Sequence, residues 1–292
     1  MQALKSVIAD AQVHIWCANT PQRPWPPDRA SYVHGAPSFG AESILAEMDG
    51  AGVDRAVLVP AFCAGDRNDI ALAAARAHPD RFAVVGRMTM GHPDARRVLE
   101  QDLGAGMAGL RLTFLDDEAV KLTDGSMDWV WPLAEERGIR LMLMAPLQSR
   151  RLLQIARNHP SLRFAVDHLG LSRTSDPRQL EGDLRQLLAL ADTPNVSVKA
   201  TAFGWFEEEG FPFPTFLGFT RRAIDAFGAD RVFWGTDFSR LKGGYRGTVD
   251  AFEEYLGFRD APERQQVMGD ALCRWLGWPT GAARTSSAQP QS

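Results

Sequence analysis

Three side chains that can move protons or bind a metal ion each stand at the end of a short apolar run: His14, His168 and Asp237. Gln12 shares a strand face with His14, because side chains two positions apart on a strand point the same way. Imidazole and carboxylate groups are common general acids and bases, and they are also common protein ligands of Zn²⁺. These residue types predict acid–base chemistry or a metal centre, provided that the fold brings them together.

Two cations lie in similar positions, Arg111 within the apolar segment 109–114 and Lys199 within 195–203. A guanidinium can bind a carboxylate through two parallel hydrogen bonds. We therefore expect both cations to hold a carboxylate of the substrate, with an internal ion pair as the alternative. Four further side chains follow or end strand-like segments and are expected to line an apolar substrate pocket, or only to pack over it: Trp16, Phe62, Met144 and Trp205.

A regular alternation of strand-like and helix-like segments can position these residues. The strand-like segments are 7–14, 53–60, 81–89, 109–114, 139–145, 162–168, 195–203 and 231–237, and each precedes a helical segment. Nearly continuous apolar runs are typical of parallel strands buried on both faces. Eight such units predict a single-domain α/β protein, a (β/α)8 TIM barrel, in which the strand ends share one mouth.

The end of the chain adds one more helix, expected over 262–277. We expect the barrel to span residues 1–282 and the small, polar residues 283–292 to form a disordered tail. A proline at position 132 should bend the helix that follows the fourth strand.

Five segments resemble the amidohydrolase superfamily, in particular the amidohydrolase-related (amidohydrolase 2) branch. They are DAQVHIW (10–16), GLRLTF (109–114), FAVDHLG (164–170), FWGTDFS (233–239) and MGDALCRWLGW (268–278). This branch includes dicarboxypyrone and muconolactone lactonases and a semialdehyde decarboxylase. By this resemblance, His14 is the second His of a strand-one pair, His168 is the strand-six His, and Asp237 is the strand-eight Asp.

The chain also departs from the family pattern at positions that matter for metal binding. Gln12 stands where the first His of the pair is expected, and the fifth strand offers Met144 in place of a His. A catalytic Zn²⁺ needs about three protein ligands. We therefore expect a site without a cofactor, with one Zn or Mn ion held by His14, Asp237 and His168 as the alternative.

The resemblance implies a hydrolase that opens a lactone of a small carboxylated compound. In this hypothesis Asp237 activates a water molecule, His168 and His14 polarise the carbonyl, and Gln12 orients the water or His14. Two alternatives stay open: a metal-dependent decarboxylase on the same scaffold, and a degenerate relative that binds a small molecule without turnover.

Composition narrows the classes of partner. The chain has 292 residues, with 32 Lys and Arg against 36 Asp and Glu, which gives a net charge of −4. No basic run suggests nucleic-acid binding, and no apolar run is long enough to cross a membrane. Three widely spaced cysteines suggest no disulfide framework, so we expect a cytoplasmic enzyme that acts on a small molecule. A homodimer through Trp275 and Trp278 is one option, and packing of these rings on the barrel is the other.

Overall fold

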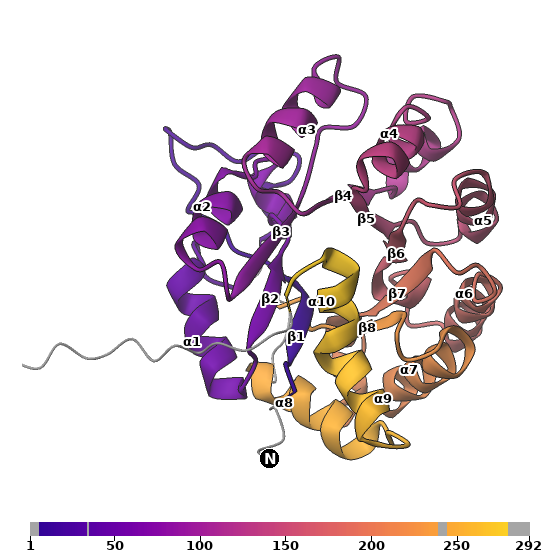
Figure 1. The fold of residues 1–292 in the computed structure, drawn as a ribbon. Helices are drawn as coiled ribbons and strands as arrows, with labels where there is room; N and C mark the ends of the chain where they lie inside the picture. Colours follow the sequence, from indigo (N-terminus) through magenta and orange to yellow (C-terminus); the bar gives the residue numbers. More distant parts are fainter. Residues whose placement is uncertain (1–5, 34, 239–243, 280–292) are drawn as a thin grey trace, which may run out of the picture.

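Eight parallel strands in chain order form the centre of the molecule, as the computed structural model shows for residues 6–33, 35–238 and 244–279 (Figure 1). The predicted tail, 283–292, lies outside the described residues. Within them the strands are β1 (Ala9–Val13), β2 (Arg55–Leu58), β3 (Phe82–Gly86), β4 (Gly109–Thr113), β5 (Arg140–Met144), β6 (Phe164–Val166), β7 (Val196–Ala200) and β8 (Val232–Trp234).

The sheet closes on itself beyond the end of β8. Val13 pairs with Phe238 in a parallel bridge, and the backbone N–H of Asp237 donates to the carbonyl of Gln12 at 3.0 Å. The predicted (β/α)8 barrel is therefore confirmed. Each observed strand lies inside its predicted segment, because the residues at the strand ends leave the sheet to form the loops of the mouth.

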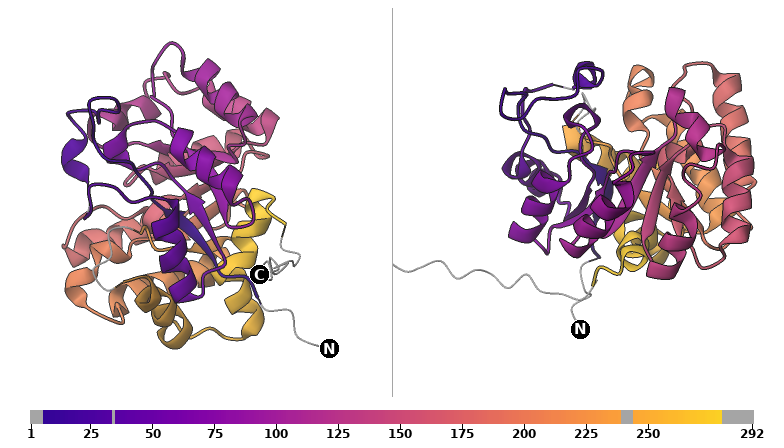
Figure 2. Two further views of the ribbon diagram at one scale, coloured as in Figure 1. Left: turned by 90° about the vertical axis from the view of Figure 1, so that its left-hand side faces the viewer. Right: turned by 90° about the horizontal axis from the view of Figure 1, so that it is seen from above.

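Helices follow the strands and surround them (Figures 1 and 2). In the described part of the chain they are α1 (Ala41–Ala51), α2 (Asp69–Ala77), α3 (Ala95–Gly104), α4 (Val130–Arg137), α5 (Ser149–Asn158), α6 (Pro177–Leu188), α7 (Pro214–Phe227), α8 (Gly244–Asp250), α9 (Ala261–Gln265) and α10 (Ala271–Leu276). The predicted effect of Pro132 is corrected: α4 begins at Val130, so the proline lies in the first turn, where its missing N–H breaks no helical hydrogen bond.

The last helices close one end of the barrel, opposite the end covered by segment 17–33 (Figure 2). Leu272, Cys273 and Trp275 of α10 belong to one apolar cluster with side chains of the strands. The Trp275 ring is 7% exposed and its centroid lies 5.5 Å from that of Phe233. The predicted C-terminal helix is thus part of the barrel's own core, and a homodimer stays a prediction.

No helix in the described ranges combines the length and the apolar character that crossing a bilayer requires. The cytoplasmic location stays a prediction.

Candidate active site

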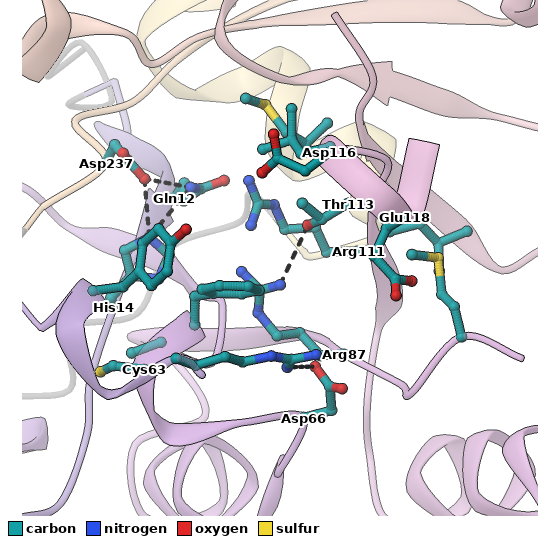
Figure 3. A pocket seen from close by; sticks show the side chains of 18 of the residues that line it. Gln12, His14, Cys63, Asp66, Arg87, Arg111, Thr113, Asp116, Glu118 and Asp237 are labelled. Atoms are coloured by element: carbon teal, nitrogen blue, oxygen red, sulfur yellow. Dashed lines mark hydrogen bonds and ion pairs between the residues drawn. The ribbon is translucent and has the colours of Figure 1, made fainter. Parts of the chain in front are cut away.

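A cavity of about 400 Å³ opens at the carboxyl ends of the strands, and most of the predicted site residues meet there (Figure 3). In a TIM barrel this face carries the chemistry, because side chains from separate strands converge on it. The predicted residues that line the cavity are Gln12, His14, Trp16, Phe62, Arg111, Met144, His168, Trp205 and Asp237. Lys199 is the predicted residue that does not line it.

Asp237, His14 and Gln12 form one contact group on a wall of this cavity (Figure 3). His14 Nε2 lies 2.9 Å from Asp237 Oδ1, and the Gln12 amide nitrogen donates to the same oxygen. His14 Nδ1 lies 2.8 Å from the carbonyl oxygen of Val59, an acceptor, so Nδ1 carries a proton. A hydrogen bond between Nε2 and Oδ1 therefore needs one more proton, which His14 and Asp237 share. Burial lowers the pKa of His14, and the adjacent carboxylate opposes that shift.

His168 stands in the cavity wall with its tautomer fixed from behind. Its Nδ1 lies 3.0 Å from the carbonyl oxygen of Thr201 and 2.8 Å from the hydroxyl of the same residue. Burial lowers the pKa of His168 to about 4, so the ring is neutral near pH 7. Because Nδ1 carries the proton, Nε2 is left with a lone pair and can only accept. The ring centroid lies 4.9 Å from that of Trp205.

The backbone is strained at His168 and at Asp237. His168 has a φ of 54° and Asp237 a φ of 55°, which side chains other than glycine rarely adopt. Such strain persists where the surrounding structure enforces it, and it clusters at functional sites. The two positions lie just after β6 and β8, so the strain coincides with the mouth of the barrel.

Lys199 lies behind the cavity wall and has no solvent exposure. Its ammonium donates to Asp167 Oδ1 at 2.8 Å and to the side-chain oxygen of Gln12. Arg111 Nε donates to the other oxygen of Asp167 at 2.7 Å. Burial opposes ionisation of Asp167, but the charges of Lys199 and Arg111 outweigh it and hold the pKa of that carboxyl well below its usual range.

The predicted role of Lys199 therefore needs correction. An ammonium that is enclosed and bonded to two protein oxygens is not placed to reach a substrate carboxylate. It orients Gln12 instead: because an ammonium can only donate, the amide oxygen faces Lys199 and the NH₂ group faces Asp237.

A second buried carboxylate, Asp10, joins β1 to the segment after β8. Its Oδ1 accepts from the backbone N–H groups of Gln12 at 2.8 Å and Thr236 at 3.0 Å. Its Oδ2 accepts from the hydroxyls of Thr236 at 2.5 Å and Tyr245 at 2.6 Å. A Cβ at Gly235 would stand 2.8 Å from Oδ1, so the glycine makes room for the carboxylate. Burial raises the pKa of Asp10 to about 6.

Several polar residues of the cavity were not predicted from the sequence. Arg87 follows β3 immediately, and the rule that selected the ends of the other strands applies to it equally. Others come from loops and short helical turns, where no periodicity marks them: Arg29, Asp66, Asp116, Asp117 and Glu118. Among the described residues, no three or more His, Cys, Asp or Glu side chains are grouped closely enough to hold a metal ion.

The profile of the amidohydrolase family matches residues 9–277. An L-fucono-1,5-lactonase from Burkholderia ambifaria is 28% identical over 249 residues, which cover 80% of this chain and 81% of the relative. Among solved structures, an amidohydrolase from Burkholderia multivorans with bound zinc superposes with a TM-score of 0.76 at 17% identity, over 94% of this chain and all of that one. A 5-carboxyvanillate decarboxylase from Novosphingobium aromaticivorans with bound manganese has a TM-score of 0.64 at 15% identity, over 94% of this chain and 97% of that one.

These comparisons overturn the expectation of a site without a cofactor. Zinc is bound in one protein of this fold and manganese in another. The expectation relied on counting His residues at strand positions. The count of His residues did not include how they are held. His14 and His168 each direct Nδ1 to a backbone carbonyl, an arrangement that is common among metal-binding histidines.

Proposed function

The chain belongs to the amidohydrolase family and is a hydrolase, and we propose that it opens the ring of a lactone, a cyclic ester, with water. The observation that carries the proposal is the direct contact between Asp237 and His14 in the wall of the cavity. The lactonase relative supports the choice of ester among the substrates that this family hydrolyses. A general base beside a cavity that admits water is what ester hydrolysis requires.

The carboxylate of Asp237 takes a proton from the attacking water in this scheme. The new C–O bond forms at the lactone carbonyl, whose electron pair moves onto its oxygen. When that oxyanion collapses, the ring C–O bond breaks and the departing alkoxide takes a proton from the Asp237–His14 pair. Sharing of a proton between His14 Nε2 and Asp237 Oδ1, 2.9 Å apart, suits the pair to both transfers.

Stabilisation of the oxyanion is assigned to Arg111 rather than to an imidazole. The sequence had suggested His168 as a hydrogen-bond donor to the carbonyl, but a neutral ring with its proton on Nδ1 has none to offer at Nε2. Arg111 lines the cavity and uses Nε for Asp167, which leaves the other guanidinium N–H groups for an oxyanion. His168 Nε2 accepts a hydrogen bond from the water or from a substrate hydroxyl.

The kinds of donor atom at this site suit a divalent ion, although the described side chains are not grouped closely enough to hold one as they stand. His168 directs an Nε2 lone pair away from its Nδ1 carbonyl partner, and His14 Nε2 offers one once the proton that it shares with Asp237 has left. Drawn together by the ion, His14, His168 and Asp237 would hold it. Such an ion supplies Lewis acidity that polarises a carbonyl and lowers the pKa of a bound water.

Turnover of a lactone panel that includes L-fucono-1,5-lactone tests the proposal, with acid release followed by a pH indicator. We expect Asp237→Asn to lower kcat/KM by about 10²–10⁴-fold, the usual contribution of a general base. Asp116→Asn is the matched control, because it removes another carboxylate of the same cavity, and should stay within a few-fold of the unaltered enzyme.

Unchanged turnover in Asp237→Asn would refute the assignment of the base. Release of CO₂ from a carboxylated aromatic compound, with no lactone opened, would favour the decarboxylase alternative. Binding of a lactone without either reaction would favour the alternative of a degenerate relative that binds a small molecule without turnover.

A further inference from the structure

Arg87 is a buried cation whose hydrogen-bonding capacity is largely unused. The residue is 4% exposed, and what is exposed lines the cavity. Its Nε donates to the carbonyl of Pro60 at 2.7 Å, and its Nη1 donates to the hydroxyl of Thr113 at 3.3 Å. A guanidinium carries five N–H donors, so three of them have no partner among the described residues. The guanidinium carbon also lies 5.5 Å from the ring centroid of Phe62.

The carboxylates whose charges act on Arg87 are bonded to other cations. Asp66 accepts from Arg29 Nη1 at 2.9 Å and from a threonine hydroxyl. Asp167 is shared by Arg111 and Lys199. In the described part of the chain, Arg87 therefore forms no ion pair, although buried charges are ordinarily paired.

A second guanidinium adds to the positive charge beside Arg87. Arg111 lines the same cavity, and after burial its charge is the next cause that lowers the pKa of Arg87, to about 9. Arg87 is thus still charged near neutral pH. The two positive charges, of Arg87 and Arg111, line one cavity and therefore favour the binding of an anion there.

We propose that Arg87 is an anion subsite that binds a carboxylate carried by the substrate, on a different side of the cavity from Asp237 (Figure 3). As the substrate of a hydrolase, the ligand is then a lactone with a carboxylate substituent, and this identity rests on the proposed function. The planar fork of the guanidinium suits the two oxygens of a carboxylate. The subsite takes over the role that the sequence had suggested for Lys199, and it leaves Arg111 to the reacting carbonyl.

Binding of an unreactive probe tests the subsite without turnover. Benzoate and benzamide have similar shapes and differ in charge, and their affinities can be measured by isothermal titration calorimetry. We expect benzoate to bind at least about tenfold more tightly than benzamide, as charge-assisted hydrogen bonds would give. Arg87→Gln should remove that preference, and Arg87→Lys should restore part of it, because it returns the charge without the fork. Arg173→Gln is the control, since that exposed arginine lines the same cavity and should leave the preference intact.

Equal affinities for benzoate and benzamide, or no saturable benzoate binding by the unaltered protein, would overturn the subsite, and this comparison needs no variant to fold. An unchanged preference in folded Arg87→Gln would overturn it too. Failure of the subsite can be distinguished from failure of the proposed reaction. If benzoate binding depends on Arg87 while no lactone is opened, the subsite stands and the reaction fails. If Asp237-dependent lactone opening occurs without benzoate preference, the reverse holds.

Discussion

Ionisation of the buried carboxyl of Asp10 should make the stability of the folded protein depend on pH. Burial raises the pKa of Asp10 from 3.8 to about 6. The folded state holds this proton more tightly than the unfolded chain does, so ionisation of Asp10 lowers the free energy of unfolding. This loss of stability is absent below about pH 4 and complete above about pH 6. A shift of roughly two pKa units corresponds to about 3 kcal/mol.

The substitution Asp10→Asn isolates this contribution. The amide keeps one oxygen for the backbone N–H groups of Gln12 and Thr236, and its NH₂ can donate to the hydroxyls of Thr236 and Tyr245, which also accept. Urea unfolding of both proteins across the pH range gives the difference in free energy of unfolding. We expect that difference, unaltered protein minus variant, to fall by about 2.5 kcal/mol between about pH 4 and about pH 7.5. Two parallel curves would refute the reasoning, whatever their constant offset.

Four further substitutions give outcomes of known sign. Gly235→Ala should lower the free energy of unfolding by about 2–4 kcal/mol, because the new Cβ would stand 2.7–2.9 Å from atoms of Thr201, Asp10 and Ala11. Gly182→Ala in α6 is the control: its Cβ meets nothing within 4 Å, so the better helix former should raise the free energy of unfolding by about 0.5–1 kcal/mol. Equal effects in urea titrations would contradict the packing argument. Lys199→Met should cost about 3–5 kcal/mol by leaving a buried carboxylate short of a partner; a loss below about 1 kcal/mol would show that this ion pair matters little. Gln12→His should tighten zinc binding by at least about tenfold, because it adds a further strong donor beside His14. An unchanged zinc affinity in competition with a chromophoric chelator would contradict this expectation.

The barrel and the place of its site could be predicted because both follow from local pattern. Apolar runs alternating with helical segments admit few topologies, and the strand-end rule then selects His14, His168 and Asp237. The same rule failed to separate two cations. Lys199 lies inside β7 and points to Asp167, whereas Arg87 lies one residue beyond β3 and faces the cavity. The direction of a long side chain depends on partners that are remote in sequence.

The sequence by itself determined which residue types stand at the strand ends, and hence that this chain carries a carboxylate, two imidazoles and a guanidinium at one mouth. Only the tertiary structure decided where the protons reside. The carbonyls of Val59 and Thr201, which directly follow β2 and β7, set the tautomers of His14 and His168. Lys199, which lies on β7 and is remote in sequence, decides which end of the Gln12 amide meets Asp237. A proton position is the outcome of contacts between segments far apart in the chain, and no spacing within one segment encodes it.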